Sequence, residues 1–282
     1  MVRYKEKIMH LVFLLTACIS IGAVALICVY LLGSGIPTIF EIGFRNFFGT
    51  VWKPGKDLYG IAPMIVASIY VTAGAILVGV PLGLLTAVFL ARFCPEKLYK
   101  ILKPAVELMA GIPSIVYGFF GLMVLVPLIQ RLTGTGGKSL LSASILLGIM
   151  ILPTIITVSE SSLRAVPEQY YEGSLALGAT HERSVYSVLL PAATSGVMSG
   201  VILGIGRAIG ETMAVIMIAG NQAMMPRGLL KGLRTMTANI VLEMGYASGL
   251  HREALIATGV VLFVFILIIN ICFSLLKRRN CE

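Results

Sequence analysis

Long apolar runs separated by short polar segments dominate this chain, and their length predicts helices that cross a membrane. A helix needs about 20 apolar residues to span a hydrocarbon core about 30 Å thick. Six runs meet this requirement: 11–32, 61–90, 106–129, 140–158, 192–220 and 254–276. None alternates apolar and polar residues as the strands of an outer-membrane barrel do. The pattern therefore predicts an all-α integral membrane protein with six transmembrane helices.

The composition supports a membrane location and indicates an orientation. Of the 282 residues, 57% are hydrophobic and 12% are charged, which is far more apolar than a soluble domain of this length. Lys and Arg gather near both termini and in the segment 92–103, so the positive-inside rule places both termini in the cytoplasm. The net charge of +9 is explained in this way, and no basic segment with interleaved aromatic residues suggests nucleic-acid binding. We expect a multi-pass protein of a prokaryotic cytoplasmic membrane.

The predicted spans divide the chain into three parts. These are an N-terminal helix with its outer loop, 1–60, a core of five spans, 61–276, with a cytoplasmic loop at about 161–191, and a cytoplasmic tail, 277–282. The first run is longer than the apolar region of a signal peptide, so we expect it to remain as a span.

Several single residues in these parts carry smaller expectations. Trp52, the only tryptophan, is expected to lie at the membrane interface as an aromatic anchor. Gly79 and Gly83 have the four-residue spacing of closely packed membrane helices. The five cysteines fall in spans or cytoplasmic segments, which predicts no disulfide. They also lack the spacing of a metal site, and nothing predicts a cofactor.

Charged and polar residues inside two of the runs are candidates for a substrate pathway. Arg207 and Glu211 are four residues apart in the fifth run, which on a helix places opposite charges on one face. Ionisable residues within a span usually serve function, although an ion pair that merely allows the helix to insert is the alternative. In the third run Glu107, Ser114 and Tyr117 are possible pathway residues. Glu107 lies near the cytoplasmic end, where a role at the helix end fits equally well.

The cytoplasmic segment 161–190 is amphipathic and is punctuated by Pro167 and Gly178. These two residues predict two short helices that meet at a turn, either an interfacial anchor or a docking surface for another protein. The glycine-rich segment 134–139 is not a P-loop, because Leu132 stands where the first glycine is required. No other segment has the P-loop pattern, so no ATP hydrolysis by such a site is expected in this chain.

The cytoplasmic segment also resembles a known motif. Glu172-Gly-Ser-Leu-Ala-Leu-Gly178, followed by Val188-Leu-Leu-Pro191, resembles the EAA motif of ABC importer permeases, with Gly173 and Ser174 at the alanine positions. The segments 110–121, 151–156 and 206–221 are similar to the permeases of phosphate-specific ABC importers, and the last of them resembles the C-type subunit.

This resemblance implies a type I ABC importer permease fold and a division of labour. The chain would form half of a pathway for inorganic phosphate, together with an A-type permease. It would not itself be an enzyme, because a dimer of ATP-binding subunits would drive transport and an extracytoplasmic phosphate-binding protein would deliver the substrate. Molybdate or sulfate is the alternative substrate, and a channel or secondary transporter is the alternative class.

The resemblance also implies roles for individual residues. Arg207 would bind phosphate, which matches a guanidinium with two hydrogen bonds, and Glu211 would take the cation when phosphate leaves. The contacts with the ATPase would come from the cytoplasmic loop, at Glu172, Gly173, Ser174, Gly178, Leu190 and Pro191.

Overall fold

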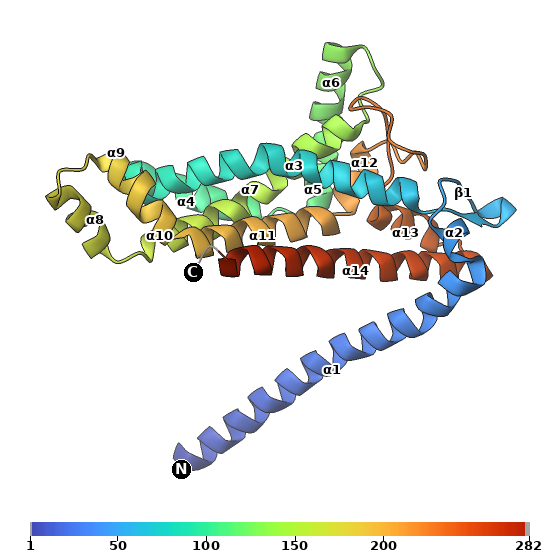
Figure 1. The fold of residues 1–282 in the computed structure, drawn as a ribbon, viewed down its shortest axis with the longest axis horizontal. Coiled ribbons are helices and arrows are strands. Elements are labelled where there is room, and N and C mark those ends of the chain that lie inside the picture. The colour runs from blue at the N-terminus through green and yellow to red at the C-terminus, as the bar shows by residue number, and fades with distance from the viewer. Residues whose placement is uncertain (1, 280–282) are drawn as a thin grey trace.

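The computed structural model describes residues 2–279, and most of them lie in helices (Figure 1). Five helical segments of the described chain are long and apolar enough to cross a membrane. They belong to α1 (Val2–Ile42), to α3 (Ala62–Val88) with its π-helical continuation η2 (Phe89–Phe93), to Ser114–Thr133, to α7 (Leu140–Arg164) and to α14 (Gly249–Arg279). A sixth span is possible if the bent pair His181–Ala192 and Thr194–Gly210 counts as one. The prediction of an all-helical membrane protein is confirmed.

The centre of the molecule is a bundle in which α7 packs between α3 and α11 (Thr194–Gly210). Glycines allow this close approach, as the spacing of Gly79 and Gly83 predicted. A Cβ atom added to Gly79 would lie 2.6 Å from the Ile151 side chain, and one added to Gly83 would lie 2.9 Å from Ile155. Gly204 of α11 faces Ile155 in the same way. Backbones that approach so closely gain dispersion contacts that hold membrane helices together.

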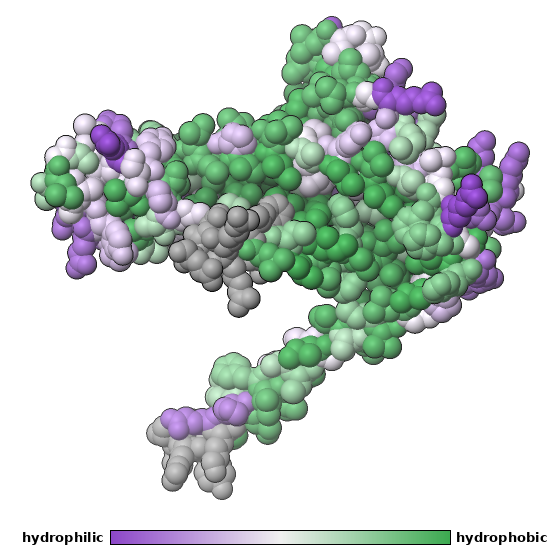
Figure 2. Space-filling model, in the orientation of Figure 1, coloured by the Kyte–Doolittle hydropathy of each residue, from purple (hydrophilic) through white to green (hydrophobic). Residues whose placement is uncertain are grey.

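Polar surface gathers at the two ends of the bundle, and the surface between them is apolar (Figure 2). One end carries α8 (Glu168–Ala176) and α9 (His181–Ser184). The other carries α2 (Phe44–Phe47), the strands β1 (Trp52–Lys53) and β2 (Leu58–Tyr59) with the turn η1 (Pro54–Lys56) between them, and α13 (Met236–Met244). The C-terminal part of α1 contacts α14 near this second end. The rest of α1 extends away from the bundle, with its apolar side chains exposed.

The third predicted span, 106–129, is wrong at its start. α4 (Glu96–Gly111) ends before Ile112, and a new helical segment begins at Ser114 with α5 (Ser114–Phe120), followed by η3 (Gly121–Leu125) and α6 (Val126–Thr133). Pro113 explains the break, since proline has no N–H to donate and its ring favours an extended backbone at the preceding residue. Ile112 has such a backbone, with φ −68° and ψ 126°.

The fifth predicted span, 192–220, is not one helix. α11 ends at Gly210, and α12 (Met213–Ile218) begins three residues later, after an extended Glu211 with ψ 130°. At the other end of α11 the chain bends by 71° next to Ala193, after the helical stretch made of α9, η4 (Val185–Leu189) and α10 (Leu190–Ala192). Hydropathy alone registers neither bend, because the apolar run continues through both.

Trp52 is not an interfacial anchor, because it is buried in a core together with Phe47, Tyr59 and Leu255. The side chain is 6% exposed, and its Nε1 donates a hydrogen bond of 2.9 Å to Glu243. The same carboxylate pairs with Arg234 at 2.5 Å and with His251 at 2.8 Å. A buried carboxylate requires such partners, so this cluster fixes the outer loop onto α13 and α14.

Two smaller expectations concern the ends of the chain and its cysteines. α14 continues to Arg279, so residues 277–279 extend the last helix, and 280–282 lie outside the described residues. Cys18, Cys28, Cys94 and Cys272 are free in the described chain, and Cys281 lies outside it.

Candidate functional site

Arg207 lies on α11, half-buried against the bundle. Its Nη1 donates to the hydroxyl of Thr154 on α7 over 3.5 Å, the long limit of a hydrogen bond. The neighbouring residues Ala208 and Ile209 belong to the same buried core as Tyr117 of α5. Within the described chain no carboxylate forms an ion pair with Arg207. The guanidinium is therefore a cation whose charge no acidic side chain balances.

Glu211 does not pair with Arg207, contrary to the geometry expected from a continuous helix. Because α11 ends at Gly210, the two residues do not share a helix face. The Glu211 carboxylate instead accepts hydrogen bonds of 3.1 Å from the backbone N–H groups of Thr212 and Ala214. These are free donors at the first turn of α12, so Glu211 caps that helix.

The candidates of the third run divide between two places. Tyr117 is buried in α5, and its hydroxyl donates a hydrogen bond of 2.8 Å to the carbonyl of Met109 on α4, across the Pro113 break. Ser114 is the first residue of α5 and is half-buried. Glu107 lies on α4, with its carboxylate exposed and 3.7 Å from Lys103 Nζ. The structure thus places Tyr117 in the same core as the neighbours of Arg207 on α11, and it places Glu107 among the ionic contacts of α4.

Glu107 also borders an open cavity of about 600 Å³ at the break between α4 and α5. Pro104, Leu108, Gly111, Ile112 and Pro113 complete its lining. The cavity is mostly apolar, and Glu107 contributes its charged group.

The segment that resembles the EAA motif forms a helical hairpin at one end of the molecule (Figure 1). Pro167 precedes α8, and Gly178 lies between α8 and α9 with φ +87°, a conformation that glycine adopts without steric cost. The hairpin exposes large apolar side chains, above all Leu177 at 91%, and also Tyr170 and Leu175. Exposed apolar side chains that cluster on a surface indicate a site of contact with another protein or with a membrane.

Local contacts hold this hairpin in shape. The Tyr171 hydroxyl lies 2.7 Å from His181 Nδ1, which joins α8 to α9. Thr180 caps α9 by accepting a hydrogen bond of 3.3 Å from the Arg183 N–H. Glu172 and Gly173 are exposed and Ser174 is half-buried, whereas on the far side Leu190 is half-buried and Pro191 is exposed.

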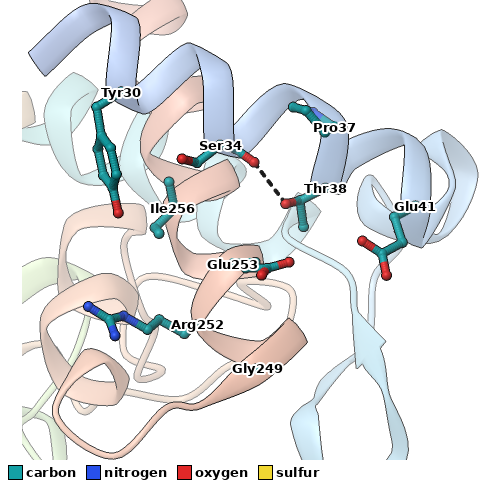
Figure 3. A pocket seen from close by; sticks show the side chains of 9 residues that line it. All are labelled: Tyr30, Ser34, Pro37, Thr38, Glu41, Gly249, Arg252, Glu253 and Ile256. Atoms are coloured by element: carbon teal, nitrogen blue, oxygen red, sulfur yellow. Dashed lines mark hydrogen bonds between the residues drawn. The ribbon is translucent and has the colours of Figure 1, made fainter. Parts of the chain in front are cut away.

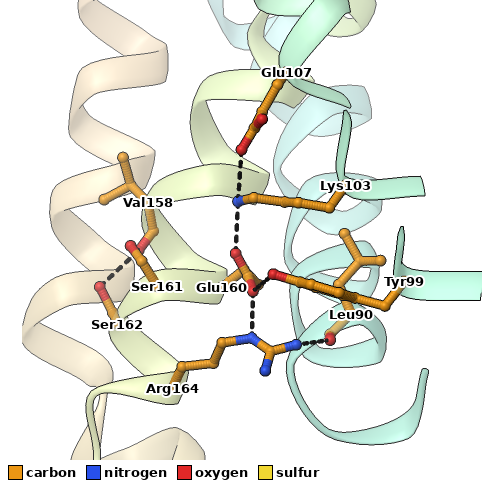
Figure 4. Close-up of polar contacts among 9 residues, drawn as sticks. All are labelled: Leu90, Tyr99, Lys103, Glu107, Val158, Glu160, Ser161, Ser162 and Arg164. Carbon is orange, nitrogen blue, oxygen red and sulfur yellow. Dashed lines mark hydrogen bonds and ion pairs between the residues drawn. The ribbon is translucent and has the colours of Figure 1, made fainter. Parts of the chain in front are cut away.

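The sequence interpretation missed Glu160, a deeply buried carboxylate near the end of α7 that adjoins the hairpin. Its side chain is 2% exposed, forms ion pairs with Lys103 Nζ at 2.7 Å and with Arg164, and accepts a hydrogen bond of 3.0 Å from Tyr99 (Figure 4). Burial raises the pKa of the Tyr99 phenol, and its hydrogen bond to Glu160 acts in the same direction, so the phenol stays a donor. A lone acid at the end of an apolar run, four residues before Arg164, was the available signal.

A separate cavity of about 550 Å³ lies between α1 and α14 (Figure 3). Its polar lining consists of Tyr30, Ser34, Thr38, Glu41, Arg252 and Glu253. It includes none of the residues that the sequence predicted for a site.

Comparison with known proteins identifies the family. Residues 79–280 match the family described as binding-protein-dependent transport system inner membrane component. The chain is 38% identical to the probable ABC transporter permease protein YqgH of Bacillus subtilis, covering 91% of this chain and 88% of the relative. It is 34% identical to the phosphate transport system permease protein PstC of Xylella fastidiosa, over 94% and 89%. The resemblance to C-type phosphate permeases is thereby confirmed.

The fold agrees with solved ABC importers. The inward-facing MetNI methionine ABC transporter aligns with a TM-score of 0.58 at 20% identity, covering 78% of this chain and 94% of that chain. A bacterial ABC transporter that imports the acidic polysaccharide alginate aligns with a TM-score of 0.59 at 13% identity, over 97% and 100%. At such low identity these matches show the fold alone. The chain belongs to the binding-protein-dependent transport system inner membrane components, and it is a multi-pass permease subunit of an ABC importer, a class in which a separate subunit hydrolyses ATP.

Proposed function

We propose that this chain is the C-type permease of an importer of inorganic phosphate. It forms half of the translocation pathway, and an A-type permease forms the other half. A dimer of ATP-binding subunits docks on the α8–α9 hairpin, and an extracytoplasmic phosphate-binding protein delivers the substrate. The PstC relatives support this assignment through their identity along nearly the whole chain.

The unbalanced charge of Arg207 is the observation that carries the proposal. An arginine within an apolar run is costly to place in a membrane, and no carboxylate in the described chain forms an ion pair with Arg207, three residues before the end of α11. A guanidinium that lacks an acidic partner is free to bind an anion. Phosphate fits because it accepts two parallel hydrogen bonds from one guanidinium, and the Thr154 hydroxyl lies within reach of the same group.

The other candidate residues of the third and fifth runs receive roles according to their positions relative to Arg207. Tyr117 and Ser114 are assigned to the pathway because α5 packs beside α12, and Tyr117 shares a buried core with Ala208 and Ile209 of α11. Glu211 contributes by capping α12, which fixes the break that follows Arg207. Glu107 lies at the cytoplasmic end of the proposed pathway, beside the open cavity.

The hairpin provides the attachment to the ATPase. Glu172, Gly173, Ser174 and Gly178 form its outer part, and Leu190 and Pro191 join it to the bend before α11. This assignment requires the hairpin and both termini to lie in the cytoplasm, as the distribution of Lys and Arg suggests.

Uptake of labelled phosphate by vesicles that contain the whole importer tests the proposal. We expect Arg207→Gln to lower uptake by about tenfold or more, because a hydrogen bond to a charged group contributes roughly 1.5–3 kcal/mol and 1.4 kcal/mol corresponds to a factor of about ten. Arg131→Gln is the matched control, since Arg131 is exposed on α6. Normal uptake by the Arg207 variant would remove this residue from the pathway.

Competition distinguishes the substrates. Sulfate and molybdate in excess should leave phosphate uptake unchanged. If either anion is itself transported and phosphate is not, the permease assignment stays and the substrate changes.

A further inference from the structure

A series of ionic contacts joins the α8–α9 hairpin to α4, the helix that leads into the proposed pathway. Glu160 lies at the centre of this series. Figure 4 shows Glu107, Lys103, Glu160 and Arg164 in a row, with Tyr99 reaching Glu160 from α4. Glu160 comes from α7, whereas Lys103 and Tyr99 come from α4. One buried carboxylate therefore binds two cations and a hydroxyl from separate segments.

α4 depends on these polar contacts for its position. In the described chain, no side chain of α4 is buried, although α4 packs along α7. An apolar core thus contributes little to the attachment of this helix. The Lys103–Glu160 ion pair, at 2.7 Å, and the Tyr99–Glu160 hydrogen bond, at 3.0 Å, are specific contacts of α4 with α7. The Arg164 guanidinium, itself paired with Glu160, also lies over the Tyr99 ring, 4.3 Å from its centroid.

Two arginines, Arg164 and Arg92, connect Glu160 to the hairpin. Arg164, paired with Glu160, donates a hydrogen bond of 2.8 Å to the Leu90 carbonyl of η2. In the reverse direction Arg92 of η2 donates to the Leu163 carbonyl of α7 at 3.4 Å. Arg92 also pairs with Glu168, the first residue of α8, at 3.0 Å.

The path continues beyond α4. The carbonyl of Met109, near the end of α4, accepts the hydrogen bond from Tyr117 of α5. Tyr117 belongs to the buried core that also contains Ala208 and Ile209 of α11. A displacement of α4 would therefore act on the core against which the helix of Arg207 packs.

We propose that Glu160 is a positioning residue that transmits movement of the α8–α9 hairpin to α4 and, through Tyr117, to the core against which α11 packs. The inference rests on the proposed function, in which an ATPase moves the hairpin. Without the carboxylate, Lys103 and Tyr99 lose their shared partner on α7. α4 then no longer follows α8, although the hairpin still binds the ATPase.

Vesicles with the complete importer test this inference through the amount of phosphate imported per ATP hydrolysed. We expect Glu160→Gln to lower this ratio about tenfold, within the range typical of coupling between two sites, while ATP hydrolysis and copurification with the ATPase persist. Lys103→Met, which removes only the α4 arm, should act in the same direction. Glu96→Gln is the matched control, because Glu96 is exposed on the same helix. An unchanged ratio in Glu160→Gln overturns the inference.

A distance measurement separates transmission from a general loss of structure. Spin labels at Leu108→Cys of α4 and Leu77→Cys of α3, both highly exposed, are placed in a chain without its native cysteines. The spacing should change on ATP binding in the otherwise unchanged chain and stay fixed with Glu160→Gln. If the variant shows the same change in spacing, Glu160 does not position α4. If the unchanged importer fails to transport phosphate, the proposed function fails instead, whatever the spacing does.

Discussion

Glu211 shows how a single residue can have a different role from the one its spacing suggests. In the sequence it stands four residues after Arg207, as an ion-pair partner would on a helix. In the structure both hydrogen bonds that its carboxylate accepts come from backbone N–H groups at the start of the next helix, at 3.1 Å. The Glu211 side chain thus caps a helix and does not pair with Arg207.

Two substitutions distinguish the oxygen from the charge. Glu211→Gln keeps an acceptor for the N–H groups of Thr212 and Ala214, so we expect phosphate uptake close to that of the unchanged importer. Glu211→Ala removes the cap, which costs about 1 kcal/mol of helix stability, and we expect lower uptake and a lower thermal unfolding midpoint in detergent. If Glu211→Gln abolishes uptake while its midpoint stays unchanged, the charge matters and the capping explanation is wrong.

Three residues show how far the sequence pattern alone predicts the role of a single side chain. Arg207 was recognisable because a charge within an apolar run has a cost that function must justify. Glu160 was overlooked because it stands where the run ends, next to the wet segment. Trp52 was misplaced because its burial depends on Glu243, 191 positions further along the chain, and no local pattern in the outer loop encodes that contact.

Among the elements, the α8–α9 hairpin depends on one backbone conformation. Gly178 has φ +87°, and nothing lies within 4 Å of where its Cβ would be. Gly173, five residues earlier, is equally open, but its backbone is helical. The two glycines therefore differ in backbone conformation and not in the space around them.

Alanine at each position should have opposite effects. Gly178→Ala places a side chain in the left-handed region, at a cost of about 1 kcal/mol, and we expect weaker copurification with the ATPase. Gly173→Ala introduces the alanine that the EAA motif has at this position, so it should stabilise α8 by roughly 0.5–1 kcal/mol and leave copurification intact. Equal copurification by both variants would show that the turn is not needed for docking.

The elements also mark the limit of hydropathy. Apolar length correctly located α3, α7 and α14, whose helices continue through most of their runs. It missed the breaks at Pro113 and Glu211 because residues on both sides of each break are apolar. The proline was a visible signal for the first break. The second is set by a side chain that bonds to the backbone beyond it, which a helical reading of the run does not suggest.

At the scale of the whole molecule, the proposed function gives the two polar ends different tasks, and this assignment depends on orientation. The hairpin and the outer cluster around Glu243 lie at opposite ends of the bundle (Figure 1). The positive-inside rule places the segment 92–103, which adjoins the hairpin through Arg92, in the cytoplasm. The hairpin reaches an ATPase only in this orientation, because ATP is supplied from the cytoplasm.

Accessibility to a membrane-impermeant maleimide tests this orientation in intact cells. In a chain without its native cysteines, we expect Leu229→Cys, which is exposed in the loop between α12 and α13, to react from outside. Leu177→Cys, at the exposed tip of the hairpin, should react only after the membrane is made permeable. Both are exposed leucines, so a difference between them reports the side of the membrane rather than burial. The reverse labelling would place the hairpin outside, and with it the proposed ATPase contact and the coupling through Glu160 would fall.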